Sequence, residues 1–154
     1  MEMRARLQAD TKEAMKARDS DRLSTLRLIG AAIKDREIAA RGSDGEGAEL
    51  TPDDLIAILS KMVKQRQESA RAYEEGGRLE LAQKEEDEIK VIQGYLPRQL
   101  DEAEAVAAVD KAIADLGAAS VRDIGRVMGE LRKRHAGQMD FGAVGVLVKQ
   151  RLLG

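Results

Sequence analysis

The chain has 154 residues, of which 43% are hydrophobic and 35% are charged, and its formal net charge at pH 7 is −2. This composition is typical of a soluble globular protein built from amphipathic helices, and the length suits one domain or two small ones. Cysteine is absent and there is a single histidine, His135, which excludes disulfides, thiol nucleophiles and cysteine- or histidine-rich metal sites, so we expect no bound metal.

Apolar residues at helical spacing predict four helices in the first 93 residues. The first covers about residues 3–18, and Asp19 or Ser20 caps the second, whose end runs into a flexible polar loop at Gly42–Gly47. Thr51 and Pro52 begin the third, which stops at Gly76–Gly77, and the fourth covers about residues 78–93. The residues expected to face inward are Leu23, Leu26, Ile29, Gly30 and Ile33, then Leu55, Ile58, Leu59, Met62 and Tyr73, then Leu81, Ala82, Ile89 and Ile92.

The segment Gly94–Leu100 predicts a corner between two parts of the chain. Pro97 lacks the N–H that a continuing helix needs, and it disfavours the helical conformation of Leu96. Asp101 and Glu104 then form a capping box that begins a new helix. We therefore expect an N-terminal helical subdomain at residues 1–96 and a C-terminal subdomain at residues 97–154.

Three shorter helices are predicted after this corner. Their expected starts are Glu102, a capping box made by Ser120 and Asp123, and Asp140. The inward residues are Val106, Val109, Ile113 and Leu116, then Ile124, Val127, Met128 and Leu131, then Val144, Leu147 and Val148. The predicted fold class is all-α, with a multihelical N-terminal subdomain and a small three-helix C-terminal subdomain.

The charge is unevenly distributed along the chain. Residues 1–41 carry a net charge of +3, residues 42–119 carry −9 and residues 120–154 carry +4. A basic tail on an acidic protein is typical of a surface that binds a polyanion, but the same pattern occurs on solvated helix faces. The candidate nucleic-acid-binding residues are Arg122, Arg126, Arg132, Lys133, Arg134 and Lys149.

Two charged residues interrupt the apolar stripes of the third and fourth helices. Arg66 shares a stripe with Leu59 and Met62, and Glu85 lies between Ala82 and Ile89. A buried charge is costly unless it is paired, and a tight double-glycine turn would bring the two helices together. Arg66 and Glu85 could therefore meet, either as a functional pair or as a structural one, or both side chains could reach water at the rim.

Motifs that carry catalysis or bind a cofactor are absent from the sequence. Glu85–Glu88 is a run of acids on a helix rather than a pair of separated carboxylates, and Gly42–Gly47 lacks the Gly-Lys-Ser/Thr ending of a phosphate-binding loop. His135 is expected to cap a helix end. We therefore expect no catalytic residue and no cofactor. The charged N-terminus and the lack of long apolar runs predict no signal peptide and no membrane partner, hence a cytoplasmic protein.

Several short motifs together resemble a known family. They are Ser24–Ile29, Ala32–Lys34, Glu37–Ile38, Lys64–Arg66, Ser69, Ala82–Glu86, Tyr95–Pro97, Gln99–Leu100, Gly125, Val127–Gly129, Gly137, Asp140 and Leu147–Lys149. Their order resembles that of the YqeY-like proteins, which are similar to the C-terminal tail domain of the B subunit of the glutamyl/aspartyl-tRNA amidotransferase. One departure is Gln138, which stands where the resemblance would place another cation.

The resemblance implies a helical module that helps to hold tRNA, while the chemistry of amide transfer lies elsewhere. It leaves three functions open: a non-catalytic tRNA-binding module, an accessory to a carbon–nitrogen ligase that uses glutamine as amide donor, and an adaptor whose acidic middle meets a basic protein partner. With few aromatic residues for base stacking, any RNA binding would rely on phosphates and shape.

Overall fold

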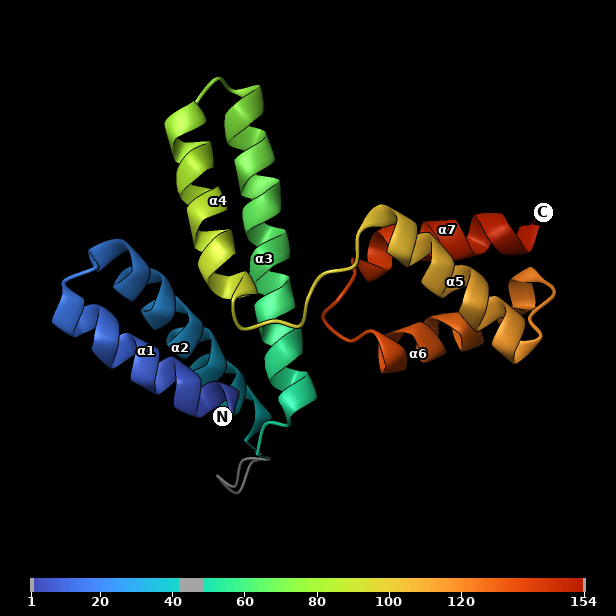
Figure 1. The fold of residues 1–154 in the computed structure, drawn as a ribbon, viewed down its shortest axis with the longest axis horizontal. Coiled ribbons are helices and arrows are strands. Elements are labelled where there is room, and N and C mark those ends of the chain that lie inside the picture. The colour runs from blue at the N-terminus through green and yellow to red at the C-terminus, as the bar shows by residue number, and fades with distance from the viewer. Residues whose placement is uncertain (1, 42–48, 154) are drawn as a thin grey trace. The chain divides into compact units, whose positions relative to one another are not determined.

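The computed structural model of the chain describes residues 2–41 and 49–153 (Figure 1). These residues form seven α-helices, one short 3-10 helix and no β-strand, so the predicted all-α fold is confirmed. The helices are α1 (Met3–Ala17), α2 (Ser20–Ala40), α3 (Pro52–Glu75), α4 (Leu79–Gln93), α5 (Glu102–Leu116), the 3-10 helix η1 (Val121–Asp123), α6 (Ile124–Arg134) and α7 (Phe141–Leu153). The loop predicted at Gly42–Gly47 lies outside the described residues.

The helices group into two compact units, Met1–Leu96 and Pro97–Gly154, and each unit has its own hydrophobic core. In the first unit, α1 pairs with α2 and α3 pairs with α4, and α2 packs against both α3 and α4. The buried residues of its core are Leu7, Ala14, Leu26, Ile29, Ile33, Leu55, Leu59, Met62, Val63, Ile89, Ile92 and Tyr95. Isolated helices of this length are marginal in water, so burial of these stripes provides most of their stability.

Side-chain oxygens begin the helices at the positions that the sequence predicts. Capping boxes made by Thr51 with Asp54 and by Asp101 with Glu104 begin α3 and α5, and Asp19 accepts a hydrogen bond from the backbone of α2. The Thr51 N–H donates to the Asp54 carboxylate at 2.9 Å, and the Asp54 N–H donates to the Thr51 hydroxyl at 3.1 Å. Hydrogen bonding of Asp54 to the backbone and then to the side chain of Thr51 lowers the pKa of Asp54. Each such cap contributes about 1 kcal/mol.

Some residues expected to face inward do not. Leu81 is 39% exposed, Gly30 is exposed and Tyr73 is only half-buried. The core of this unit ends at Val63 on α3 and Ile89 on α4, so Leu81 and Tyr73 lie beyond it, near the turn between the helices. Helical spacing showed that these residues share a side of their helix, but it could not show where the partner helices stop.

The second unit is a three-helix bundle in which α5, α6 and α7 all contact one another. Its buried residues are Val109, Ala112, Val127, Met128, Leu131, Val144, Val148 and Leu152. Gln138 has a structural role here: its backbone carbonyl accepts from the Leu100 N–H at 2.9 Å, and its side-chain amide donates to the Arg98 carbonyl at 3.1 Å. These bonds tie the segment before α5 to the loop before α7.

Tyr95 anchors the end of α4 to α1. Its side chain is 5% exposed, and its hydroxyl donates a hydrogen bond to Asp10, which also lies 3.7 Å from the guanidinium of Arg22. The guanidinium of Arg6 stacks 5.0 Å from the centre of the Tyr95 ring and donates to the Gly94 carbonyl at 3.1 Å. Contacts between residues of α1 and the segment after α4 thereby cover the end of the core at Tyr95.

Arg66 pairs with Glu88, so the suggested pairing with Glu85 is wrong. The Arg66 Nε lies 3.0 Å from the Glu88 Oε2, and the two side chains are 14% and 18% exposed. Arg66 also donates to the Met62 carbonyl at 3.2 Å. Both partners lie eleven positions from Gly77, whose positive φ of 75° reverses the chain, and the antiparallel register places them opposite each other. The pair is structural.

We expect Tyr95→Phe to lower the free energy of unfolding at pH 7 by about 1.5 kcal/mol, because it removes a hydrogen bond to a carboxylate. The folded state also raises the pKa of Tyr95 to about 12, first through burial and then through Asp10. Stability from this group is therefore complete below the unfolded pKa near 10 and is lost as the pH rises through 12. Urea unfolding between pH 8 and 12 should show a steeper loss for the unmodified protein than for Tyr95→Phe. Tyr73→Phe is the control and should keep the original slope.

We expect Glu88→Gln to lower the free energy of unfolding by about 1–2 kcal/mol, between the values for exposed and fully buried ion pairs. Glu85→Gln, on the same helix, should change it by less than about 0.5 kcal/mol. Urea unfolding at neutral pH measures both. Equal effects of the two substitutions would contradict the assignment of Glu88 as the partner of Arg66.

Candidate nucleic-acid interface

The structure places the six candidate cations in the second unit, on η1, α6 and α7 (Figure 1). All six are exposed: Arg122, Arg126, Arg132, Lys133, Arg134 and Lys149. They differ in what they contact, and the contacts divide them into two groups.

Arg134 and Arg126 are engaged by carboxylates of their own unit. Arg134 bonds Glu130 and Asp115, each at 2.9 Å, and these bonds raise its pKa, with Glu130 contributing more. Arg126 lies 3.3 Å from Asp123. Hydrogen bonds from the backbone N–H groups of the turn before η1 lower the pKa of Asp123, so it stays charged beside Arg126. A phosphate would have to displace these carboxylates.

The other four cations, Arg122, Arg132, Lys133 and Lys149, form no ion pair within residues 2–41 and 49–153. Arg132 lies over the ring of Phe141, with 5.7 Å between the guanidinium carbon and the ring centre. Such stacking leaves the edge of the guanidinium free to donate hydrogen bonds. These cations are therefore available to an external anion.

Ion pairs to α5 show which side of the bundle the available cations occupy. Arg134 on α6 reaches Asp115 and Arg151 on α7 reaches Asp110, so these two arginines mark the sides of α6 and α7 that face α5. Helical periodicity places Arg132 and Lys149 on the opposite sides of the same two helices. We call the surface formed by Gly125, Gly129, Arg132, Val146 and Lys149 the α6–α7 face.

Two glycines leave the backbone of this face open. Gly125 and Gly129 are exposed within α6, and a Cβ added at either would meet nothing within 4 Å. Glycine inside a helix costs up to about 1 kcal/mol relative to alanine, and packing does not require it here. The arrangement instead permits a close approach to the helix backbone between the cations. In the sequence these glycines stand out only as part of a family motif.

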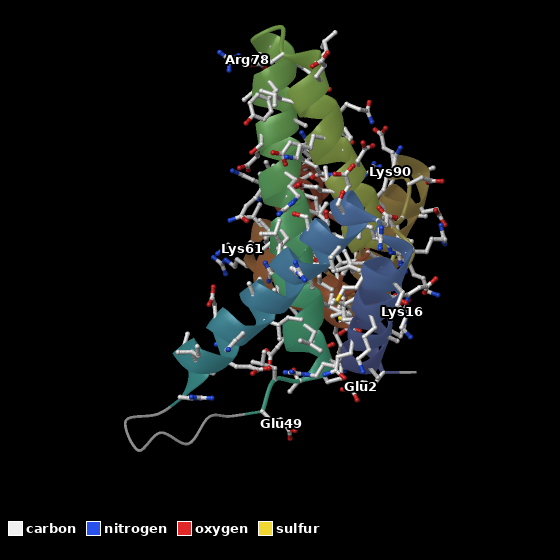
Figure 2. The ribbon with its side chains drawn as sticks, turned by 90° about the vertical axis from the view of Figure 1, so that its left-hand side faces the viewer. Glu2, Lys16, Glu49, Lys61, Arg78 and Lys90 are labelled. Carbon is white, nitrogen blue, oxygen red and sulfur yellow. The ribbon has the colours of Figure 1, made fainter. Side chains whose placement is uncertain are left out.

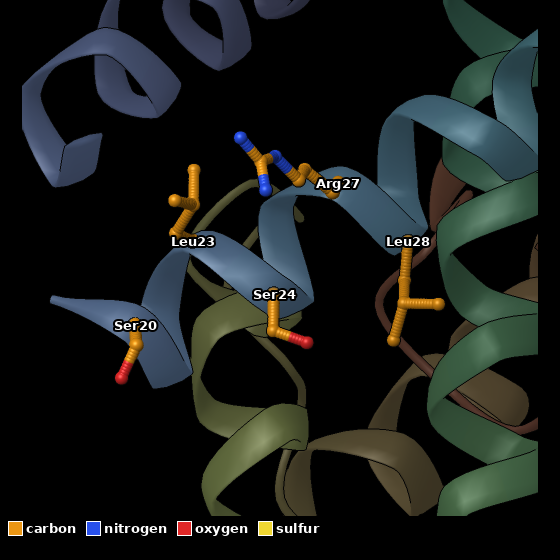
Figure 3. A pocket seen from close by; sticks show the side chains of 5 residues that line it. All are labelled: Ser20, Leu23, Ser24, Arg27 and Leu28. Carbon is orange, nitrogen blue, oxygen red and sulfur yellow. The ribbon is translucent and has the colours of Figure 1, made fainter.

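Another surface feature is a hollow of about 350 Å³ over α2, lined by Ser20, Leu23, Ser24, Arg27 and Leu28. Figure 3 shows Arg27 and Leu23 directed to one side of the helix and Ser20, Ser24 and Leu28 to the other. The guanidinium and the hydroxyls therefore do not converge on one point. This hollow offers no set of donors that could clasp an anion.

Two other kinds of site are absent from the described part of the chain. It contains no group of three or more histidine, cysteine, aspartate or glutamate side chains placed to hold a metal ion. None of its helices combines the length and the apolar character that crossing a membrane requires.

Relatives of this chain are found among fungal proteins. It is 36% identical over 114 residues to "Altered inheritance of mitochondria protein 41, mitochondrial" of Lachancea thermotolerans, an alignment that covers 73% of this chain and 58% of that protein. The protein of the same name from Vanderwaltozyma polyspora is 41% identical over 90 residues, covering 58% of this chain and 46% of the relative. The chain thus spans about half the length of these relatives.

A family comparison covers much more of the chain than these pairwise alignments do. The family model described as Yqey-like protein matches residues 4–152, which include both units and the α6–α7 face. The order of motifs seen in the sequence is therefore that of a family whose members share this helical domain, and the chain belongs to the YqeY-like family.

Proposed function

We propose that this protein is a non-catalytic accessory module that binds tRNA through the α6–α7 face. The observation that carries the proposal is the group of exposed cations without ion pairs, of which Arg132 and Lys149 flank the open backbone at Gly125 and Gly129. The resemblance to the tail domain of the amidotransferase B subunit supports tRNA as the polyanion. The fungal relatives are named as mitochondrial proteins, and tRNA occurs both in mitochondria and in the cytoplasm.

The geometry suits recognition of an RNA backbone. Phe141, at the start of α7, lies beside Arg132. Lys149 is eight residues after Phe141, so the two positions are about 12 Å apart along the axis of α7. Two cations at this separation would contact phosphates that are not adjacent. The sugar between those phosphates would then lie against the glycines. Double-stranded RNA is recognised by its shape and by contacts to phosphates and 2′-hydroxyls. A handful of such contacts predicts weak, salt-sensitive binding.

A role beside a carbon–nitrogen ligase is compatible with the same surface. If the module holds tRNA while a partner enzyme transfers the amide, its own residues need only bind and orient the RNA. An adaptor that binds protein alone would not need the exposed cations of the second unit. Binding of purified tRNA to the isolated protein separates these functions, because an adaptor for proteins would not bind it.

We expect replacement of Arg122, Arg132 and Lys149 by Gln to weaken tRNA binding and to reduce the slope of log K against log salt by about 2–3, at up to 0.9 per lost phosphate contact on the scale for duplex DNA. Binding is measured by fluorescence anisotropy between about 25 and 200 mM salt, which spans weak and strong screening.

The control replaces Arg126, Arg134 and Arg151 by Gln, which removes the same charge from the same unit. These arginines already pair with Asp123, with Glu130 and Asp115, and with Asp110. The slope should therefore change by less than about 1. Equal losses in the two variants would show that net charge, and not the cations without ion pairs, governs binding. Absence of tRNA binding by the unmodified protein at low salt would refute the proposed function.

We expect Gly129→Ala to stabilise the second unit by up to about 1 kcal/mol, because the new Cβ enters open space on a helix. The same methyl group should weaken tRNA binding severalfold by blocking approach to the backbone. Gly30→Ala is a matched control, since Gly30 lies within α2 and its added Cβ also meets nothing within 4 Å. It should raise stability similarly and leave binding unchanged. Thermal unfolding and anisotropy test both; unchanged binding by Gly129→Ala would contradict close approach at this site.

A further inference from the structure

The hairpin formed by α3 and α4 extends beyond the core of the first unit. The core residues of the two helices end at Val63 and Ile89. Further out, the buried side chains of α3 and α4 are the small Ala70 and Ala82. Figure 1 shows the green end of the hairpin lying away from α1 and α2, and Figure 2 shows Arg78 at this end. We call residues 74–81 the hairpin tip.

The hairpin tip exposes apolar side chains outside the core of the unit. Leu79 is 67% exposed and Leu81 is 39% exposed, and both lie in the first turn of α4. With Gly77, Arg78 and Glu80 they line an open hollow of about 450 Å³. Neither leucine belongs to the buried core of the unit, and Leu79 is the more exposed of the two. They offer apolar area to a molecule that covers the tip.

The charges at the end of α3 are unfavourable for the isolated protein, whereas Glu80 is favourably placed in the first turn of α4. Glu74 and Glu75 lie at the C-terminal end of α3, where the helix dipole is negative, and the last turn contains no basic residue. Glu74, Glu75 and Glu80 form no ion pair with any residue that the structure describes. Residues 74–81 carry these three acids against Arg78 alone. A cationic ligand would relieve this repulsion.

We propose that the hairpin tip docks a basic amphipathic helix of a protein partner. Leu79 would contact the apolar stripe of that helix, with Leu81 at the edge of the same hollow, and Glu74, Glu75 and Glu80 would pair with its lysines or arginines. This charge complementarity disfavours nucleic acid, whose phosphates the acids repel, and a second copy of the chain, whose tip carries the same charge. The site is separate from the α6–α7 face, and it does not depend on tRNA binding.

The test titrates the ¹⁵N-labelled full chain with synthetic peptides of about 14 residues, which is roughly four helical turns. One peptide combines leucine and lysine in an amphipathic helical pattern. The second keeps the lysines and replaces leucine by serine, and the third keeps the leucines and replaces lysine by glutamate. Only the leucine–lysine peptide should bind at micromolar to low millimolar concentration, with chemical-shift changes concentrated at the hairpin tip.

Two pairs of variants then separate the apolar and charged contributions. Leu79→Ser with Leu81→Ser should weaken binding about tenfold, since each 1.4 kcal/mol is a factor of ten. Leu28→Ser with Ile38→Ser, exposed apolar residues of α2, is the control and should leave binding unchanged. Glu74→Gln with Glu75→Gln should also weaken binding several-fold while raising the temperature of unfolding, because the repulsion at the end of α3 is removed. Glu86→Gln with Asp87→Asn is the charge control on the same hairpin.

Several results would overturn the proposal. Equal binding of the serine–lysine peptide would show a merely acidic surface, and shift changes away from residues 74–81 would place the site elsewhere. Loss of self-association on substitution of Leu79 and Leu81, measured by sedimentation, would assign the tip to a second copy of the chain. Failure of tRNA binding would leave this proposal unaffected, because its readout is the peptide and its site lies in the other unit.

Discussion

The hydrogen bond from Tyr95 to Asp10 is the contact on which the end of the N-terminal unit depends. It joins the residue after α4 to the middle of α1, and it does so from within the core, where an unpaired hydroxyl would be costly. Arg6 adds to the same junction by stacking on the ring and by binding the Gly94 carbonyl. The helix therefore ends where tertiary contacts hold it, and Pro97 two residues later prevents its continuation.

The second unit uses part of its positive charge to hold its own helices together. Arg134 and Arg151 bridge α6 and α7 to α5, whose acids Asp115 and Asp110 lie within 4 Å of them. Pairing on the α5 side leaves Arg132 and Lys149, on the opposite side, without an ion pair to any described residue. A net charge counted along the sequence cannot distinguish these two uses, because ion pairs within a unit cancel locally while the exposed cations keep their field.

In both units, a local rule of stability is broken where the structure gives no packing reason for it. Gly125 and Gly129 weaken α6, although a side chain would fit, and Glu74 and Glu75 oppose the dipole of α3. Such conflicts between local preference and fold are expected at functional sites, where stability is given up for an interaction with a ligand. The glycines fit the proposed surface for close backbone contact, and the acids fit the proposed docking of a cationic partner, so the two proposals rest on different units.

The sequence by itself determined the helices, their caps and the all-α class, because each depends on residues within about one turn of one another. Capping boxes such as Asp101 with Glu104 and the turn at Gly76–Gly77 are local, and their physical chemistry is the same in any fold. The sequence also indicated the basic segment that supplies the candidate interface. It could not indicate which of its cations are free.

Only the tertiary structure decided the pairings between helices. The register of α3 against α4 places Arg66 beside Glu88 rather than Glu85. Leu81 lies beyond the end of the core and is therefore 39% exposed. The same holds for the candidate interface, where Arg134 forms an ion pair with Asp115 of α5, whereas Arg132 stacks on Phe141 and forms no ion pair with a described residue. Helical periodicity assigns a side chain to a side of its own helix, whereas its partner depends on the register and reach of a second helix, which are properties of the packed molecule.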